Sequence, residues 1–473
     1  MRKLYWYISA YLRKHGWQFL LALLGGIAIF SFLVPWLIRT ITRQSTYYIG
    51  IVGEYQLYNL PELVKEQLSP GLMAIDDDGS FIPDLAEKVI IENDGQRYRI
   101  ILPENLFWQN GQRFATTDFN YQLKDVTVTK TQTEVIYDLP APYASFPQYL
   151  VEPILLPSTV GWSKFFQEDT LVGLNNVEIS KIQYTDRNKN NIKEIVLDDL
   201  TEKKRYVYRF YFTQDQAVEA FKLGEIDYLF DVTNAEEIAG WSNVAINERE
   251  NEDQYLAVFF NSNDPLMTKN LRLALSYAIN KEYGGLKRAL GPISESSWAF
   301  LKGVKPYDQN YQTAVERLSD ELPGEPIELE LVSTSSYYEI AQNIKRDWEE
   351  LGERAATACL EDKDIKDKKP CEYLRLKVKL QIQNFPDLNN FQTLLVGQEV
   401  SLDPDQYSLW HSGLATNFTS YKNTKVDSLL EKGRQTLDQK ERLTIYQEFQ
   451  QTLLEDPPAV FLWYLRSSDL VRK

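Results

Sequence analysis

The longest uninterrupted apolar stretch of the chain lies near its beginning. Residues 17–38, WQFLLALLGGIAIFSFLVPWLI, span 22 positions without a charged side chain. A helix of this length measures about 33 Å, which is enough to cross the hydrocarbon core of a bilayer. Four Lys and Arg residues precede the stretch, and this basic excess predicts that residues 1–16 are cytoplasmic.

A cleaved signal peptide is the alternative interpretation of the same stretch. The apolar run is longer than the core of a signal peptide, and no small-x-small cleavage site follows it. The sequence therefore predicts a single-pass anchor in the cell membrane over residues 17–38. A linker over residues 39–47 and an extracytoplasmic remainder would follow.

Beyond the linker, short apolar stretches alternate with amphipathic ones. YYIGIVG (47–53), GQRYRIILP (95–103) and YVYRFYF (206–212) have the pattern of strands. Four later stretches have the apolar spacing of helices, and their expected end signals are Gly224 after the first, Thr268 before the second, Gly352 after the third and Asp438 before the fourth. Alternation of this kind predicts α/β lobes.

Charge excludes one class of partner. Beyond residue 43 the chain carries 45 Lys and Arg residues against 67 Asp and Glu residues. Such an acidic surface repels phosphate backbones, so we expect no nucleic-acid partner.

The only two cysteines are Cys359 and Cys371, in ACLEDKDIKDKKPCEY. An oxidising exterior permits a disulfide between them, and two free thiols on a surface loop are the alternative. The neighbourhood offers too few further ligands for a zinc site, and we expect neither a metal nor a cofactor.

Eight stretches, in this order, resemble the extracellular solute-binding proteins of the oligopeptide, dipeptide and nickel importer type, known as family 5. They run from DDDGSFIPDLAEK to DPPAVFLWY. The matching stretches are residues 76–88, 98–119, 217–232, 255–282, 291–300, 403–412, 417–430 and 456–464.

The resemblance implies an α/β, two-lobed, periplasmic-binding-protein-like (type II) ectodomain behind the N-terminal transmembrane helix. Such lobes close around a ligand by a hinge motion. The implied parts are lobe I (48–262, with a shortened subdomain at about 75–150), lobe II (263–455) and a strand returning to lobe I (456–473). Asn261 and Asn263 would lie at the hinge.

Some family features are altered here. Peptide-binding members carry an aspartate three residues before the Asp-Pro pair, where it holds the amino terminus of the peptide. Val400 occupies this position. A helical extension after residue 119 and a glycine-rich GTGPY stretch are also missing, so recognition of a peptide amine does not transfer directly.

DPDQYSLWHSG (403–413) carries one of the two histidines of the chain. A Ser-His-Asp triad needs its members within hydrogen-bond reach, whereas adjacent side chains such as His411 and Ser412 diverge. We therefore expect this stretch to line a ligand crevice with flat aromatic and hydrogen-bonding groups. The candidate ligand-binding residues are Tyr55, Trp298, Asp403, Tyr407, Trp410, His411, Ser412 and Asn417.

These observations predict a membrane-anchored, non-enzymatic substrate-binding component of an ABC importer. It would capture a peptide or a similar small solute and deliver it to permease and ATPase subunits. A solute-sensing or scaffold ectodomain without a transport role is the first alternative. A cell-surface hydrolase, whose turnover would depend on His411, is the second.

Overall fold

The structure is a computed structural model that describes residues 45–473, except 77, 120, 122, 161–167, 234, 283–284 and 321, together with Trp6, Trp17 and Gly26. The predicted anchor at 17–38 lies outside the described residues apart from two single positions. Within the described part of the chain, no helix combines the length and apolar character needed to cross a membrane.

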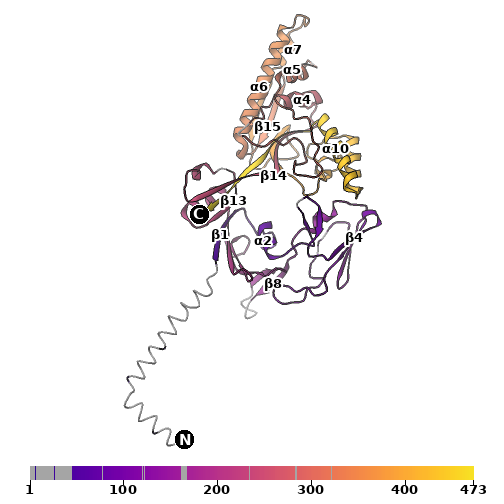
Figure 1. The fold of residues 1–473 in the computed structure, drawn as a ribbon. Helices are drawn as coiled ribbons and strands as arrows, with labels where there is room; N and C mark the ends of the chain where they lie inside the picture. Colours follow the sequence, from indigo (N-terminus) through magenta and orange to yellow (C-terminus); the bar gives the residue numbers. More distant parts are fainter. Residues whose placement is uncertain are drawn as a thin grey trace.

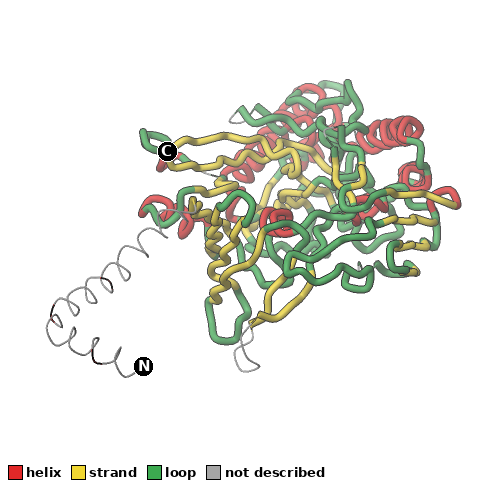
Figure 2. Tube along the Cα trace, turned by 60° about the horizontal axis from the view of Figure 1, so that its bottom comes forward, coloured by secondary structure: helices red, strands yellow, loops and turns green. Residues whose placement is uncertain are grey.

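One ten-stranded sheet runs through both lobes (Figures 1 and 2). The lobe I strands lie at one end of this sheet and the lobe II strands at the other, with β18 and β14 between them. In order across the sheet, the strands are β10 (Val177–Tyr184), β11 (Ile192–Asp199), β12 (Lys204–Tyr211), β1 (Ser45–Val52), β13 (Tyr228–Val232), β18 (Ala459–Arg472), β14 (Val244–Phe260), β17 (Thr393–Glu399), β15 (Glu328–Ser333) and β16 (Lys377–Ile382).

Lobe I carries a second unit with its own core. Its main sheet is antiparallel, and two buried side chains of that sheet, Tyr98 and Tyr137, pack on Phe146. The strands of this sheet are β4 (Lys88–Glu92), β5 (Arg97–Ile101), β7 (Glu134–Asp138) and β6 (Thr127–Lys130), and the flanking pairs are β2 (Met73–Ile75) with β3 (Phe81–Pro83) and β8 (Leu156–Val160) with β9 (Glu168–Val172).

Most of the described α-helical residues belong to lobe II, and two α-helices are described in lobe I. Those of lobe I are α2 (Glu62–Leu68) and α3 (Gln214–Leu223). Those of lobe II are α4 (Lys269–Ala278), α5 (Tyr311–Ser319), α6 (Tyr338–Glu361), α7 (Lys369–Tyr373), α8 (Tyr407–Trp410), α9 (Thr424–Gln435) and α10 (Gln439–Glu455). Single 3-10 turns are η1 (Asn93–Gly95), η2 (Phe146–Leu150), η3 (Glu236–Ile238) and η4 (Ser335–Tyr337).

Three of the four helix end signals are confirmed. Thr268 and Asp438 accept hydrogen bonds from the backbone of the first turns of α4 and α10. Gly224 ends α3 with a left-handed φ of 77°. The fourth prediction is wrong, because α6 continues through Gly352 to Glu361. A Cβ at Gly352 would lie 2.3 Å from the backbone nitrogen of Leu376, so close packing explains this glycine.

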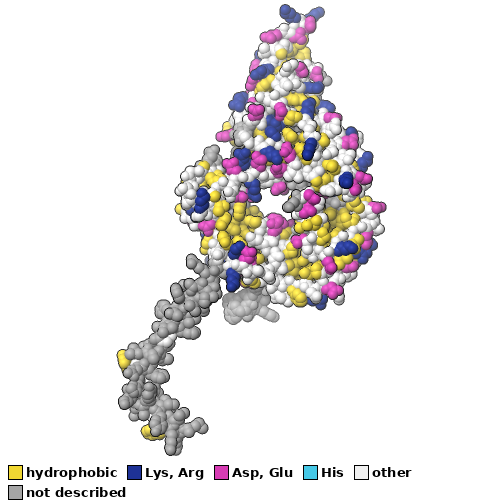
Figure 3. Space-filling model, in the orientation of Figure 1, with side chains coloured by type: hydrophobic (Ala, Val, Ile, Leu, Met, Phe, Trp, Pro, Cys, Tyr) yellow, Lys and Arg dark blue, Asp and Glu magenta, His cyan; other side chains and the backbone are white. Residues whose placement is uncertain are grey.

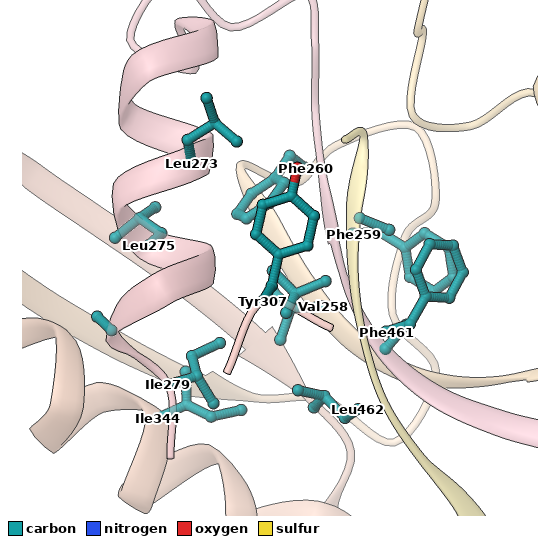
Figure 4. Close-up of a cluster of buried hydrophobic side chains, with 14 of the residues drawn as sticks. Val258, Phe259, Phe260, Leu273, Leu275, Ile279, Tyr307, Ile344, Phe461 and Leu462 are labelled. Carbon is teal, nitrogen blue, oxygen red and sulfur yellow. The ribbon is translucent and has the colours of Figure 1, made fainter. Parts of the chain in front are cut away.

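The lobe II core surrounds the carboxyl end of β14 and the amino end of β18 (Figure 4). Phe259 of β14 and Phe461 of β18 pack there with Leu275 of α4 and Ile344 of α6, all of them buried. At the far end of this lobe, a disulfide joins Cys359 to Cys371 and ties α6 to α7.

Candidate ligand-binding crevice

The direction of the lobe I strands determines which of its loops face lobe II. Strand β18 runs from lobe II into lobe I, and β13 pairs antiparallel to it, so the carboxyl end of β13 points back toward lobe II. Strand β1 is parallel to both β13 and β12. The loops that follow these three strands therefore emerge on the side of lobe I that faces lobe II.

The lobe II strands are oriented in the opposite sense. Strand β14 enters lobe II from lobe I, and β17 pairs antiparallel to it, so β17 runs back toward lobe I and ends at Glu399. Strand β15 is parallel to both β17 and β16. The loops that follow all three strands therefore face lobe I.

The carboxyl ends of the parallel strands of both lobes thus point at one common gap. The space-filling view shows the molecule hollowed between the lobes at this place (Figure 3). Ligands of open α/β sheets bind outside the carboxyl ends of the strands. This crevice, between the loops after β1, β12 and β13 and the loops after β15, β16 and β17, is the candidate site.

On one side, the crevice is bounded by the strands that cross between the lobes. Asn251 of β14 pairs with Leu465 of β18, but Tyr255 already pairs with Tyr464, so the residues between Asn251 and Tyr255 form a bulge. Bulges bend a strand and interrupt its ladder. The passage from one lobe to the other therefore coincides with an irregularity in both strands.

Glu252 fixes the bulge to lobe II. Its carboxylate accepts hydrogen bonds from Lys287, from the Ser294 hydroxyl at 2.6 Å and from the Ser296 backbone at 3.1 Å. Burial works against ionisation of Glu252, but these hydrogen bonds outweigh burial and lower its pKa to about 2.

Asn261 and Asn263, the expected hinge residues, lie elsewhere. They follow the end of β14 at Phe260, where β14 pairs with the beginning of β17, and so lie at the edge of the lobe II sheet that faces away from lobe I. The Asn261 side chain donates to the Phe391 carbonyl at 2.8 Å and accepts from the Asn263 backbone at 3.0 Å. Both residues line an outer hollow of about 850 Å³.

On the other side of the crevice, residues 143–145 of lobe I meet α9, α10 and the 403–405 loop of lobe II. We call this the interlobe contact. Asp403, Ser145 and Arg442 are all buried, with exposed fractions of 1%, 0% and 6%. Arg442 donates two hydrogen bonds to the Asp403 carboxylate, at 2.7 and 3.0 Å. The Ser145 hydroxyl donates to Asp403 at 2.8 Å and accepts from Arg442 at 3.0 Å.

A second charged pair lies beside the first. Arg434 donates to the Asp405 carboxylate at 2.7 Å and to the Tyr143 hydroxyl at 3.2 Å. Its guanidinium carbon lies 4.7 Å from the Tyr143 ring centroid and 4.1 Å from that of Tyr407. The Tyr407 ring in turn stacks on His411 at 4.2 Å. A layer of flat groups therefore crosses from one lobe to the other.

A cavity of about 430 Å³ opens beside this layer. Its walls come from both lobes, with Pro142, Tyr143 and Tyr149 on one side and Tyr407 and Arg434 on the other. This volume lies within the range of small-molecule sites. Of the candidate ligand residues, Tyr407 is the one that lines it.

Tyr55 and Trp298 lie near the crevice in different lobes. Tyr55 is half-buried just after β1 and packs on Phe210 with ring centroids 5.0 Å apart. Burial and the nearby Asp231 carboxylate raise the pKa of its hydroxyl. Trp298 of lobe II lies beside Gly79 of lobe I, where an added Cβ would come within 3.5 Å of the indole.

The remaining candidates are engaged in local structure. Trp410 is fully buried in the lobe II core, with its ring 6.2 Å from that of Phe259. Asn417 is buried and donates to the Tyr421 carbonyl at 2.9 Å. The Ser412 backbone and hydroxyl donate to Asp427, at 2.8 and 2.5 Å.

The side chains of His411 and Ser412 form hydrogen bonds with different carboxylates. His411 Nε2 lies 3.2 Å from Glu431, and Nδ1 accepts from the Gly413 backbone at 3.1 Å. The two side chains therefore do not form the nucleophile–base pair of a triad. In the described part of the chain, no group of three or more His, Cys, Asp and Glu residues is placed to hold a metal ion.

Sequence reasoning missed Ser145, Tyr143, Arg434 and Arg442. The local signal is that Arg442 lies one helical turn before Tyr446 on the face of α10 that also buries Phe449 and Leu453. A buried arginine requires a carboxylate partner, and Asp403 could have been considered as that partner.

The comparisons with known proteins agree with this architecture. NikZ from Campylobacter jejuni, solved in complex with Ni(L-His), superposes with a TM-score of 0.69 at 22% identity over 90% of this chain and 94% of that one. The ABC transporter substrate binding protein CtaP from Listeria monocytogenes gives 0.70 at 20% identity over 91% and 94%. These likenesses show the fold.

Sequence comparison identifies the family. The oligopeptide-binding protein AppA of Bacillus subtilis is 32% identical over 78 residues, which are 16% of this chain and 14% of that protein. The chain thus matches only a small part of the length of that curated relative. The family model for bacterial extracellular solute-binding proteins, family 5, matches residues 80–399, about two thirds of the chain. This chain therefore belongs to the bacterial extracellular solute-binding proteins of family 5.

Proposed function

We propose that the chain is the solute-capturing component of an ABC importer and binds a peptide or a similar small solute between its two lobes. The observation that carries this proposal is the opposition of strand carboxyl ends across the crevice, because each lobe then offers its loops to the same ligand. The similarity to AppA, an oligopeptide-binding protein, and to CtaP, a transporter substrate-binding protein, supports the same class of activity.

A thermal-shift screen of the full chain in detergent tests solute binding. The probes are peptides of two to nine residues and nickel–histidine complexes. A solute present at a hundred times its dissociation constant stabilises the folded chain by about 2.7 kcal/mol, which is a readily measured shift. If the melting temperature stays unchanged with every probe, binding of these two solute classes is contradicted.

Paired variants test where the solute lies. Tyr55→Ala changes the loop after β1, at the edge of lobe I that faces the crevice. Tyr206→Ala is the control, because Tyr206 is also half-buried but lies near the beginning of β12, toward the opposite edge of the same sheet. We expect Tyr55→Ala to weaken binding of the solute and Tyr206→Ala to leave its affinity unchanged. Equal effects of the two variants contradict this placement.

The membrane location is part of the same proposal. It is supported by the 22-residue uncharged stretch at 17–38 and by the basic residues before it. A chain anchored in this way stays with the membrane pellet after extraction at alkaline pH, and protease added outside the cell degrades the part that follows the anchor. Release of the chain into the supernatant contradicts the anchor.

A further inference from the structure

The charged groups of the interlobe contact all belong to lobe II. Asp403 pairs with Arg442 and Asp405 pairs with Arg434, at 2.7 Å in each case. Burial disfavours the charge of Arg442, but Asp403 outweighs burial and raises the pKa of the guanidinium. Neither ion pair needs lobe I, so both can persist when the lobes separate. Lobe II therefore carries a preformed polar surface that faces lobe I.

Among the described residues, three uncharged residues of lobe I form hydrogen bonds with this surface. The Ser145 hydroxyl both donates to Asp403 and accepts from Arg442. The Ala144 backbone donates to the Arg434 carbonyl at 2.6 Å. The Tyr143 hydroxyl accepts from Arg434 at 3.2 Å, and its ring covers one face of that guanidinium. Each of the three residues thus makes its own bond across the lobe boundary.

The interlobe contact lies across the gap from the strands that connect the lobes, where it opposes their opening. In Figure 1, α10 lies above β4 on one side of the gap between the lobes, whereas β13 and β14 lie on the other side. The strands hold the lobes together covalently at the crossing side, while the interlobe contact holds them through hydrogen bonds at the opposite side. Rotation about the bulge at Glu252 would separate residues 143–145 from lobe II.

We propose that residues 143–145 dock on lobe II before a solute binds, so that the resting protein is predominantly closed. This inference rests on the proposed function, because it describes the open–closed equilibrium of the same crevice. Interactions that exist only in the closed form increase the population of that form. Here those interactions are made between groups of the protein itself, so closure does not require a solute to bridge the lobes.

Single-molecule Förster resonance energy transfer (FRET) tests this proposal. The sample is the full chain in detergent, freed of co-purified solute by exhaustive dialysis. The labels replace Leu200 of lobe I and Phe385 of lobe II, which are 50% and 94% exposed. They are attached through unnatural amino acids, which leaves Cys359 and Cys371 undisturbed. The variant is Tyr143→Phe combined with Ser145→Ala, which removes two hydroxyls and no charge.

We expect one narrow distance population for the parent chain without solute. In the double variant, the ratio of open to closed molecules should rise about tenfold, as expected for the loss of hydrogen bonds to charged groups. Ser180→Ala is the matched control, because its hydroxyl donates to the Val196 carbonyl at 3.3 Å within lobe I. This control should behave like the parent chain.

Two results would overturn the inference. One is a broad or long distance distribution in the parent chain without solute, and the other is a double variant that cannot be distinguished from Ser180→Ala. The measurement contains no solute, so it stands apart from the thermal-shift screen. If the screen finds no solute, the proposed function fails, but a closed resting state in the energy-transfer measurement still stands. If the screen finds a solute and the chain without solute is open, only the present inference fails.

Discussion

Arg442→Met tests the energetics of the buried pair in lobe II. The guanidinium makes two hydrogen bonds to Asp403, one to the Gly433 carbonyl at 3.0 Å and one to Ser145 at 3.0 Å. Methionine keeps much of the side-chain length but none of these bonds, and it removes the cation from Asp403, a residue that is 1% exposed in the parent chain. Breaking a buried pair from one side costs about 3–5 kcal/mol, so the free energy of unfolding should fall by that amount.

Urea unfolding of the full chain, followed by tryptophan fluorescence, measures this loss. Adding Asp403→Asn to Arg442→Met is the decisive control. The amide removes the buried charge yet still accepts from the Asp405 backbone, which lies 3.0 Å from Asp403 Oδ1. The pair of substitutions should therefore recover at least half of the lost stability. The reasoning fails if Arg442→Met costs under about 1 kcal/mol, or if the second substitution lowers stability further.

Three further outcomes follow from the structure. Trp410→Ala should lower the free energy of unfolding by about 3–5 kcal/mol in chemical denaturation, because it empties a fully buried position, while the remaining folded chain keeps its solute affinity. Glu252→Gln should lower the free energy of unfolding at neutral pH. Because the pKa of Glu252 is depressed in the folded state, its stabilising effect is complete above pH 4.5 and is lost as pH falls toward 2, so the difference in unfolding free energy from the parent should shrink over that range. A difference that stays constant with pH would argue against this. Reducing the disulfide between Cys359 and Cys371, 12 positions apart, should cost about 2–3 kcal/mol by calorimetry, and the doubly Ser-substituted chain should show no response to reductant.

Much of the local structure could be predicted from the sequence. Thr268 and Asp438 were identifiable as helix caps because a cap depends on groups three residues away. Gly352 was misjudged for the complementary reason. The signal that a glycine gives is the same whether it ends a helix or allows close packing, and the neighbour that decides here, Leu376, lies 24 positions later, just before β16.

The site was harder to predict, because its bonds are long-range. Ser145 and Arg442 are 297 positions apart, and nothing near either residue identifies the other as its partner. Asp403 was assigned to a ligand with the rest of the 403–413 stretch, but α10 supplies an arginine that donates hydrogen bonds to both carboxylate oxygens. Tyr407 was assigned to the crevice with the rest of its stretch, and it lines the cavity between the lobes.

The place of β18 in the sheet affects how the protein is made. This strand follows every other strand of the chain in sequence, yet it lies between β13 and β14 near the middle of the sheet. Until it is synthesised, β13 and β14 both lack their common neighbour, and neither lobe can complete its share of the sheet. We therefore expect the large sheet to be completed only after the last strand of the chain has been synthesised, which makes the pairing of β13 and β14 with β18 a late step of folding.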